Sequence, residues 1–149
     1  MTNSIITFSN NWILELLYSY LDGKLSLGDL LDSLSKHIVV EFSSISGRRE
    51  ILRNNLEGTI SLEFRRIHLS KMLTKYLEGQ ISELDLSDWC AFIFLSGLFV
   101  PERKTEEERW EAGDGPLWEI LQQLMSPSVF GGLDFSKAKD YLNYLEGKE

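Results

Sequence analysis

The fold is decided by the stretch YLEGQISELDLSDW, residues 76–89. Gly79 can adopt a positive φ and end the preceding helix, because it has no Cβ. Ser82 can accept a hydrogen bond from the first turn of a following helix, and Asp85, three residues on, completes a shortened capping box. Glu83 and Asp85 also place negative charge at the positive end of that helix. The stretch therefore predicts a helix end followed at once by a helix start.

The same pattern occurs 56 residues earlier, as YLDGKLSLGDL at residues 20–30. Tyrosine, leucine, glycine, serine, aspartate and leucine recur at the same relative positions, and fragments of the pattern follow at residues 56–61 and 145–148. The repetition has two interpretations: one efficient helix–turn–helix connector used several times, or a duplicated helical hairpin. Both predict a helical protein, and the irregular spacing argues against a solenoid.

Apolar stripes and cap signals predict helices along the rest of the chain. Helix starts are expected at Ser9 or Asn10, Ser26, Ser82, Thr105, Pro116 and Ser136, and a further helix is expected to bury Leu62, Leu69, Leu73 and Tyr76. The run Ile38–Phe42 has the composition of a strand, but it continues a helical pattern without an obvious pairing partner, so helix is expected there too. The helix from Glu83 to about Leu98 is apolar on all sides from Trp89 on, which predicts a central position.

These signals predict an all-α fold with one domain, residues 1–149. We expect a compact helical bundle of about six to eight helices, built around the two helix–turn–helix hairpins. A hydrophobic fraction of 43% is enough for a sizeable core.

The single cysteine, Cys90, excludes an intramolecular disulfide and a zinc site built on several cysteines. Residues 1–9 lack the basic region of a signal peptide, and the longest apolar run, Trp89–Pro101, is too short to span a bilayer. A cytoplasmic protein without a membrane partner is therefore expected.

The net charge of −8 is distributed unevenly. Residues 1–75 carry nine Lys or Arg against eight Asp or Glu, whereas residues 76–149 carry six against fifteen. Such a surface repels nucleic acid and anionic membranes and attracts a basic protein. The alternative is an acidic face that only keeps the protein in solution. The basic segment Arg48–Lys75 is expected to pair with acids inside the domain rather than to bind nucleic acid.

The sequence contains no motif for a cofactor, a metal or catalysis. No phosphate-binding glycine loop and no G-x-S-x-G motif is present, and His37 and His68 lie far apart in the sequence. Cys90 is expected to be buried and inert because its neighbours are apolar. Glu107 and Glu111 lie one helical turn apart, but on a charged helix they are expected to be surface acids. We therefore expect no enzyme and no cofactor.

The pattern Y-L-[DE]-G-x-[LI]-S-x-x-[DE]-L, with Trp89 three residues after Leu86, resembles small bacterial immunity proteins of colicin-type and contact-dependent growth inhibition toxins. The resemblance covers residues 13–38 and 69–95. It implies an acidic helical protein that binds and neutralises a cognate toxin domain, commonly a basic nuclease. It assigns no functional residue.

The expected function is therefore the binding and blocking of a toxin domain, by steric and electrostatic means. Acids around an aromatic anchor suit such a surface. The residues expected to bind the partner are Glu83, Asp85, Asp88, Glu106, Glu107, Glu108, Trp110, Glu111 and Asp114. The alternatives are a regulatory adaptor that binds another basic protein and a small hydrolase that uses the carboxylates.

Overall fold

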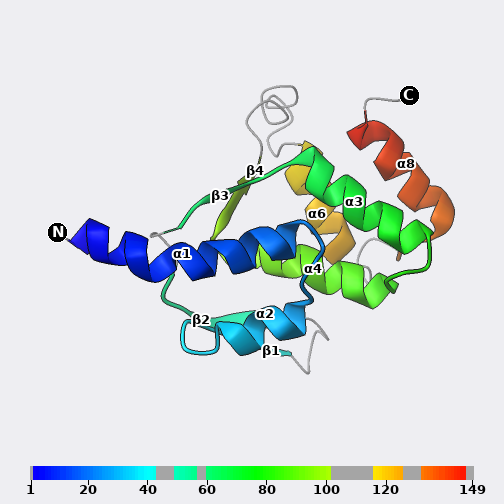
Figure 1. Ribbon diagram of the computed structural model, residues 1–149. Coiled ribbons are helices and arrows are strands. Elements are labelled where there is room, and N and C mark those ends of the chain that lie inside the picture. The colour runs from blue at the N-terminus through cyan, green and yellow to red at the C-terminus, as the bar shows by residue number, and fades with distance from the viewer. Residues whose placement is uncertain (1, 43–48, 57–59, 102–115, 126–131, 147–149) are drawn as a thin grey trace.

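The computed structural model describes residues 2–42, 49–56, 60–101, 116–125 and 132–146, with the backbone alone for residues 2–11, 42, 49 and 116. Within these ranges the fold is mixed: six helices stand beside two small sheets of two strands each (Figure 1). The predicted all-α class is therefore wrong. The helices are α1 (Thr2–Leu21), α2 (Leu27–Ser33), α3 (Arg66–Leu77), α4 (Glu83–Leu95), α6 (Pro116–Met125) and α8 (Phe135–Leu145). The strands are β1 (Ile38–Phe42), β2 (Arg49–Asn54), β3 (Leu62–Phe64) and β4 (Phe99–Pro101).

The run Ile38–Phe42, expected to be helical, is strand β1. It pairs antiparallel with β2, from Ile38 opposite Asn54 to Phe42 opposite Arg49, with a register shift between Val39 and Val40. Ile and Val favour strands because their branched side chains pack well on a pleated surface. The partner strand β2 lies in the basic segment Arg48–Lys75, where no strand was predicted, so the pairing was missed.

The second sheet joins segments that are distant in the sequence. Strands β3 and β4 are parallel, with Leu62 opposite Phe99, and the Leu62 N–H donates to the Leu98 carbonyl at 2.8 Å. Leu62 therefore belongs to a strand and not to the helix predicted around it. Likewise α4 ends at Leu95, and Gly97 turns the chain with φ at 75° before β4 begins.

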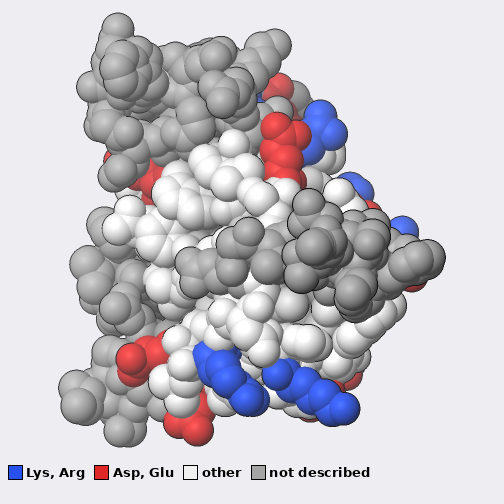
Figure 2. All heavy atoms as spheres, turned by 90° about the vertical axis from the view of Figure 1, so that its left-hand side faces the viewer, with Lys and Arg blue, Asp and Glu red and all other residues white. Residues whose placement is uncertain are grey.

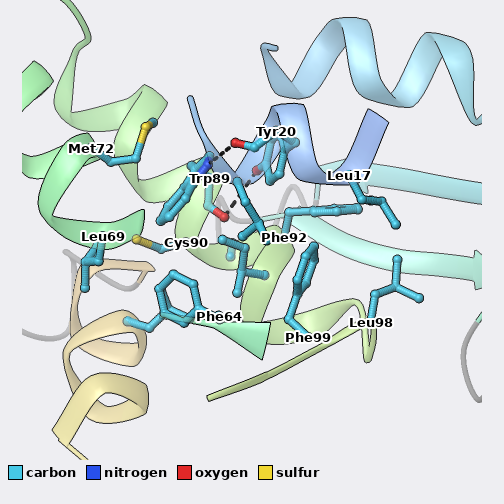
Figure 3. Packing of buried hydrophobic residues seen from close by; sticks show 14 of the residues in the cluster. Leu17, Tyr20, Phe64, Leu69, Met72, Trp89, Cys90, Phe92, Leu98 and Phe99 are labelled. Atoms are coloured by element: carbon cyan, nitrogen blue, oxygen red, sulfur yellow. Dashed lines mark hydrogen bonds between the residues drawn. The ribbon is translucent and has the colours of Figure 1, made fainter. Parts of the chain in front are cut away.

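The predicted central position of the α4 segment is confirmed. Leu86, Trp89, Cys90, Phe92 and Ile93 are all buried. Figure 3 shows the side chains of Trp89, Cys90 and Phe92 packed among residues from α1, α3 and both strands of the β3–β4 sheet. Helix α4 packs on α3, α6 and β2, while α8 covers α3 and α2 lies against α1. An apolar surface on every side of a helix needs neighbours on every side, which explains this position.

Of the other predicted helix starts, one is confirmed and two are wrong. Helix α6 begins at Pro116, as predicted, while α1 begins at Thr2 rather than at Ser9 or Asn10. The cap of α8 is Asp134, not Ser136, and its side chain accepts a hydrogen bond from the Lys137 N–H at 2.8 Å. The helix predicted from Thr105 lies outside the described residues. Across the part of the chain that is described, no helix has the length and apolar character needed to cross a membrane.

Candidate functional site: the cavity between the two connectors

The two repeated sequences form turns of the same geometry. We name residues 19–29 the first connector and residues 75–85 the second connector. Gly23 and Gly79 both have φ at 77°. The Gly23 N–H donates to the Tyr20 carbonyl at 3.1 Å, and the Gly79 N–H donates to the Tyr76 carbonyl at 3.1 Å. Both helices therefore end in a left-handed glycine that satisfies their last carbonyls, as the sequence predicted.

The helix starts match as well. The Ser26 side chain accepts from the Asp29 N–H at 3.1 Å, and the Ser82 side chain accepts from the Asp85 N–H at 3.0 Å. In the second connector the Asp85 carboxylate also accepts from the Ser82 N–H at 3.0 Å, which completes the predicted capping box.

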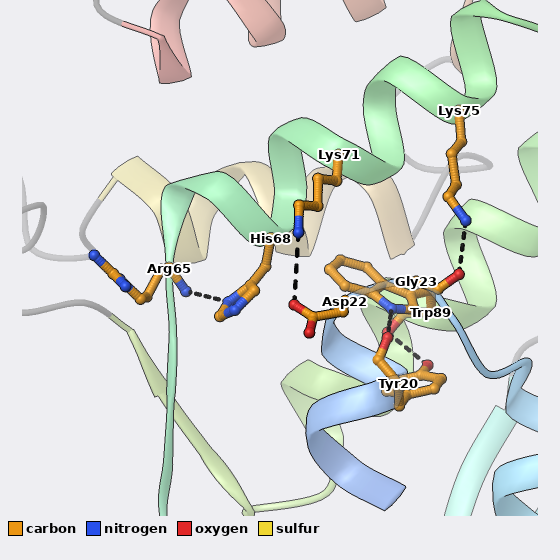
Figure 4. A network of polar contacts seen from close by, with 8 residues as sticks. All are labelled: Tyr20, Asp22, Gly23, Arg65, His68, Lys71, Lys75 and Trp89. Carbon is orange, nitrogen blue, oxygen red and sulfur yellow. Dashed lines mark hydrogen bonds and ion pairs between the residues drawn. The ribbon is translucent and has the colours of Figure 1, made fainter. Parts of the chain in front are cut away.

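A reciprocal pair of hydrogen bonds joins the end of α1 to the middle of α4. The Tyr20 hydroxyl donates to the Trp89 carbonyl at 3.2 Å, and the Trp89 indole N–H donates to the Tyr20 carbonyl at 3.0 Å (Figure 4). Both side chains are buried, so both polar groups need these partners. The pair fixes the first connector against the helix that the second connector starts.

A lysine makes a further link between the hairpins. The Lys75 ammonium donates to the Gly23 carbonyl at 2.6 Å, so the last turn of α3 holds the turn of the first connector (Figure 4). Close by, Lys71 lies 3.7 Å from the Asp22 carboxylate, but both side chains are well exposed, and such ion pairs contribute little stability.

A cavity of about 360 Å³ lies between the two connectors. We name it the connector cavity. It is lined by Tyr20, Gly23, Lys24, Leu25, Ser26, Leu27, Gly28, Met72, Lys75, Ile81, Asp85, Asp88 and Trp89. Tyr20, Met72 and Trp89 are buried, whereas Lys24 and Asp85 are exposed. The lining therefore combines an aromatic and apolar interior with charged groups that reach solvent.

The structure brings together two of the nine residues predicted to bind a partner. Asp85 and Asp88 both line the connector cavity, one helical turn apart on α4. Glu83 has another role, because its carboxylate accepts a hydrogen bond from the Leu133 N–H at 2.8 Å and fixes the approach to α8. The other predicted residues, Glu106, Glu107, Glu108, Trp110, Glu111 and Asp114, lie outside the described residues.

The sequence did not assign a binding role to the cavity residues of the first hairpin. Lys24 and Gly28 lie in the first connector, and Lys75 lies in the last turn of α3. The repeated sequence was the only feature that could have pointed to these residues, since it showed two similar connectors. It contained no information that their turns would meet.

The basic segment is engaged within the molecule where it is described. Arg65 lies 3.9 Å from the Glu63 carboxylate, and Arg53 donates to the Ser35 carbonyl at 3.1 Å. The Arg66 guanidinium lies 5.6 Å from the centre of the Tyr144 ring. Pairing with acids, as predicted, thus holds for Arg65, whereas the Arg53 contact is with the backbone.

The described reactive side chains make structural contacts. Cys90 is buried, as predicted, and burial raises the pKa of its thiol well above the ordinary value, which disfavours the reactive thiolate. A His37 ring nitrogen contacts the Asn55 side chain at 3.1 Å, and a His68 ring nitrogen accepts from the Arg65 N–H at 2.9 Å. Among the described residues, no three His, Cys, Asp or Glu side chains are placed to hold a metal ion.

Few described charged side chains lie on one side of the molecule. Figure 2 shows the left-hand side of Figure 1, where most described atoms are uncharged and a few Lys, Arg, Asp and Glu side chains lie near the edges. The end of α3 and the start of α4 lie at the opposite, right-hand side of Figure 1. The start of α4 therefore lies away from the side that Figure 2 shows.

Comparison with protein-family models, with curated proteins and with solved structures finds no match to this chain.

Proposed function

We propose that this chain is an immunity protein, which binds a basic toxin domain and blocks it by steric and electrostatic means. The observation that carries the proposal is the charge distribution: the net charge is −8, and the excess of acids lies in residues 76–149. The placement of Asp85 and Asp88 at the connector cavity gives two of these acids a concave setting. The resemblance of the two connectors to immunity proteins supports a toxin as the partner class.

In the proposed mechanism, negative charge acts both during the approach of the partner and in the bound complex. At long range, a negative field speeds the approach of a basic domain and repels nucleic acid. At contact, carboxylates pair with the basic groups that a nuclease uses to hold phosphates, while the bulk of the fold obstructs access to them. Helix α4 suits this role because a rigid element presents Asp85 and Asp88 without a large ordering cost.

The proposal predicts that a gene beside the one for this chain encodes a toxin with a nuclease domain, and the test uses that domain. We expect calorimetry to show one-to-one binding and a nuclease assay to show loss of activity at equal concentrations. Absence of binding to that domain would contradict the proposal. Binding of a different basic protein, with the nuclease left active, would favour the adaptor alternative.

Charge reversal tests which acids matter. The variant with Glu106, Glu107 and Glu111 changed to Lys should bind more weakly, because it reverses acids expected at the interface. The matched control changes Glu15, Asp32 and Glu41 to Lys, since these exposed acids lie in the first half and reverse the same amount of charge. Equal weakening by both variants would show that net charge alone drives binding.

A further inference from the structure

We propose that the connector cavity is an anchor pocket for one arginine or lysine side chain of the partner. The inference rests on the proposed function only for the partner's identity. The preference of the cavity for a cation follows from its own lining and is tested separately.

The size and lining of the cavity suit a long basic side chain. Its volume of about 360 Å³ exceeds what one such side chain needs. Leu25, Met72, Ile81 and Trp89 offer apolar contact to the methylene stem. Asp85 and Asp88 also line the cavity, and a carboxylate can accept several hydrogen bonds, so each can contact the charged head in addition to the interactions it already makes. Arginine and lysine bury their stems against apolar surface in this manner, and their heads form charge-assisted hydrogen bonds.

Lys24 and Lys75 also line the cavity, so its preference for a cation over an anion depends on whether these lysines are available to a ligand. The Lys75 ammonium is held at 2.6 Å by the Gly23 carbonyl, which already occupies one of its hydrogen atoms. Lys24 is exposed and sits on a long flexible stem, so it can move into solvent at little cost. The positive groups are therefore either engaged or movable.

The negative groups are better fixed. The carboxylates of Asp85 and Asp88 stand on short side chains in the first turns of α4, and the Asp85 carboxylate is oriented by the Ser82 N–H at 3.0 Å. The net charge of −8 adds a field of the same sign. A cation therefore meets fixed opposite charge, whereas an anion would have to draw in Lys24 against that field.

The test follows the ¹⁵N-labelled full chain by NMR during titration with N-acetyl-arginine methylamide. The reporter is the Trp89 indole N–H, which donates to the Tyr20 carbonyl beside the cavity. We expect saturable shifts with a dissociation constant on the order of millimolar, as for a single anchoring side chain. The matched probe N-acetyl-citrulline methylamide has the same shape without the charge and should bind at least about threefold more weakly.

Three variants test where the probe binds and which charge the site prefers. Gly28→Met adds a bulky side chain at the wall of the cavity and should weaken binding; its new Cβ meets only the Ser26 hydroxyl, at 4.0 Å, so the fold is retained. Ser33→Met is the control, because it adds the same side chain to an exposed position of α2 outside the cavity. Lys24→Gln removes the competing cation and should tighten binding of the arginine probe.

Three results would overturn the inference. They are equal binding of the citrulline probe, undiminished binding by Gly28→Met, and weaker binding by Lys24→Gln. The last result would indicate that Lys24 helps to hold the probe, for example by donating to one of its amide carbonyl groups.

The toxin domain then separates this inference from the proposed function. If the domain binds and is inhibited equally by the wild-type chain and Gly28→Met, the proposed function stands and the anchor pocket is contradicted. If the arginine probe binds with the expected selectivity while no toxin domain binds, the preference for a cation stands and the proposed function fails.

Discussion

The first and second connectors have the same turn and different continuations. Gly23 and Gly79 share a φ of 77°, and Ser26 and Ser82 cap the next helix in the same way. Beyond the cap, α2 ends after 7 residues, whereas α4 continues for 13. Trp89 is buried in the core, while its counterpart 56 residues earlier is the exposed Ser33.

This difference separates local from tertiary causes of structure. The turn depends on a glycine, a serine and an aspartate at fixed spacing, so it forms in both places. The length of the following helix depends on whether its side chains find a core. The matching turns are compatible with both a duplicated hairpin and a reused connector.

The largest contrast is expected at the paired positions Trp89 and Ser33. Trp89→Ala should lower the free energy of unfolding by about 3–5 kcal/mol, because it leaves a hole in the core and removes a hydrogen bond to Tyr20. Ser33→Ala should change it by less than about 0.5 kcal/mol. Chemical denaturation of both variants measures the contrast, and similar losses would show that the two hairpins are not used differently.

The two turn glycines provide a second contrast. Gly79→Val should destabilise by about 1 kcal/mol or more, because a β-branched residue is strained at positive φ. Gly23→Val should cost more, since its Cβ would also lie 3.1 Å from the Met72 sulfur and 3.2 Å from the Lys75 nitrogen. Thermal unfolding compares the variants, and an unchanged melting temperature for Gly79→Val would argue against its role as a helix end.

The two serine caps should differ less. Ser82→Ala and Ser26→Ala each remove one side-chain bond to a helix N–H, at a cost of about 1 kcal/mol. The loss at Ser82 should be the larger, because the helix that it starts carries more of the core. Urea denaturation checks the order, and a greater loss at Ser26 would contradict it.

The smallest effect is expected from Tyr76, the counterpart of Tyr20. Burial, followed by the charges of Glu83 and Asp134, raises the pKa of the Tyr76 hydroxyl above its ordinary value of 10.0. The unfolded chain therefore loses this proton first, and stability should fall as the pH rises through 10.0 towards the folded-state pKa. Tyr76→Phe should reduce that fall in denaturation series between pH 9 and 11, a range of about one unit around the usual tyrosine pKa. If Tyr76→Phe leaves the dependence of stability on pH unchanged, the fall in stability does not come from the Tyr76 hydroxyl.

Sequence reasoning succeeded where the cause was local and failed where pairing was distant. The connectors, the start of α6 and the central position of α4 follow from caps, proline and an apolar run. The pairing of Leu62 with Phe99 is not visible in either segment alone, since a three-residue strand has almost no pattern. At the candidate site, Asp85 and Asp88 were predicted to bind a partner and do line the cavity, while their binding role stays a prediction. Lys24 became relevant only because the two connectors meet.

The most direct test of an acidic inhibitor with a basic target is the association rate at two ionic strengths. Stopped-flow mixing of the chain with the toxin nuclease domain should give roughly 10⁸ M⁻¹s⁻¹ at low salt if charges steer the encounter. The rate should fall steeply near 0.15 M salt, where exposed charges are screened beyond about 8 Å. Reversing Glu106, Glu107 and Glu111 to Lys should slow association at low salt while leaving the fold intact. A rate that responds neither to salt nor to this reversal would contradict electrostatic recognition through the acidic second half.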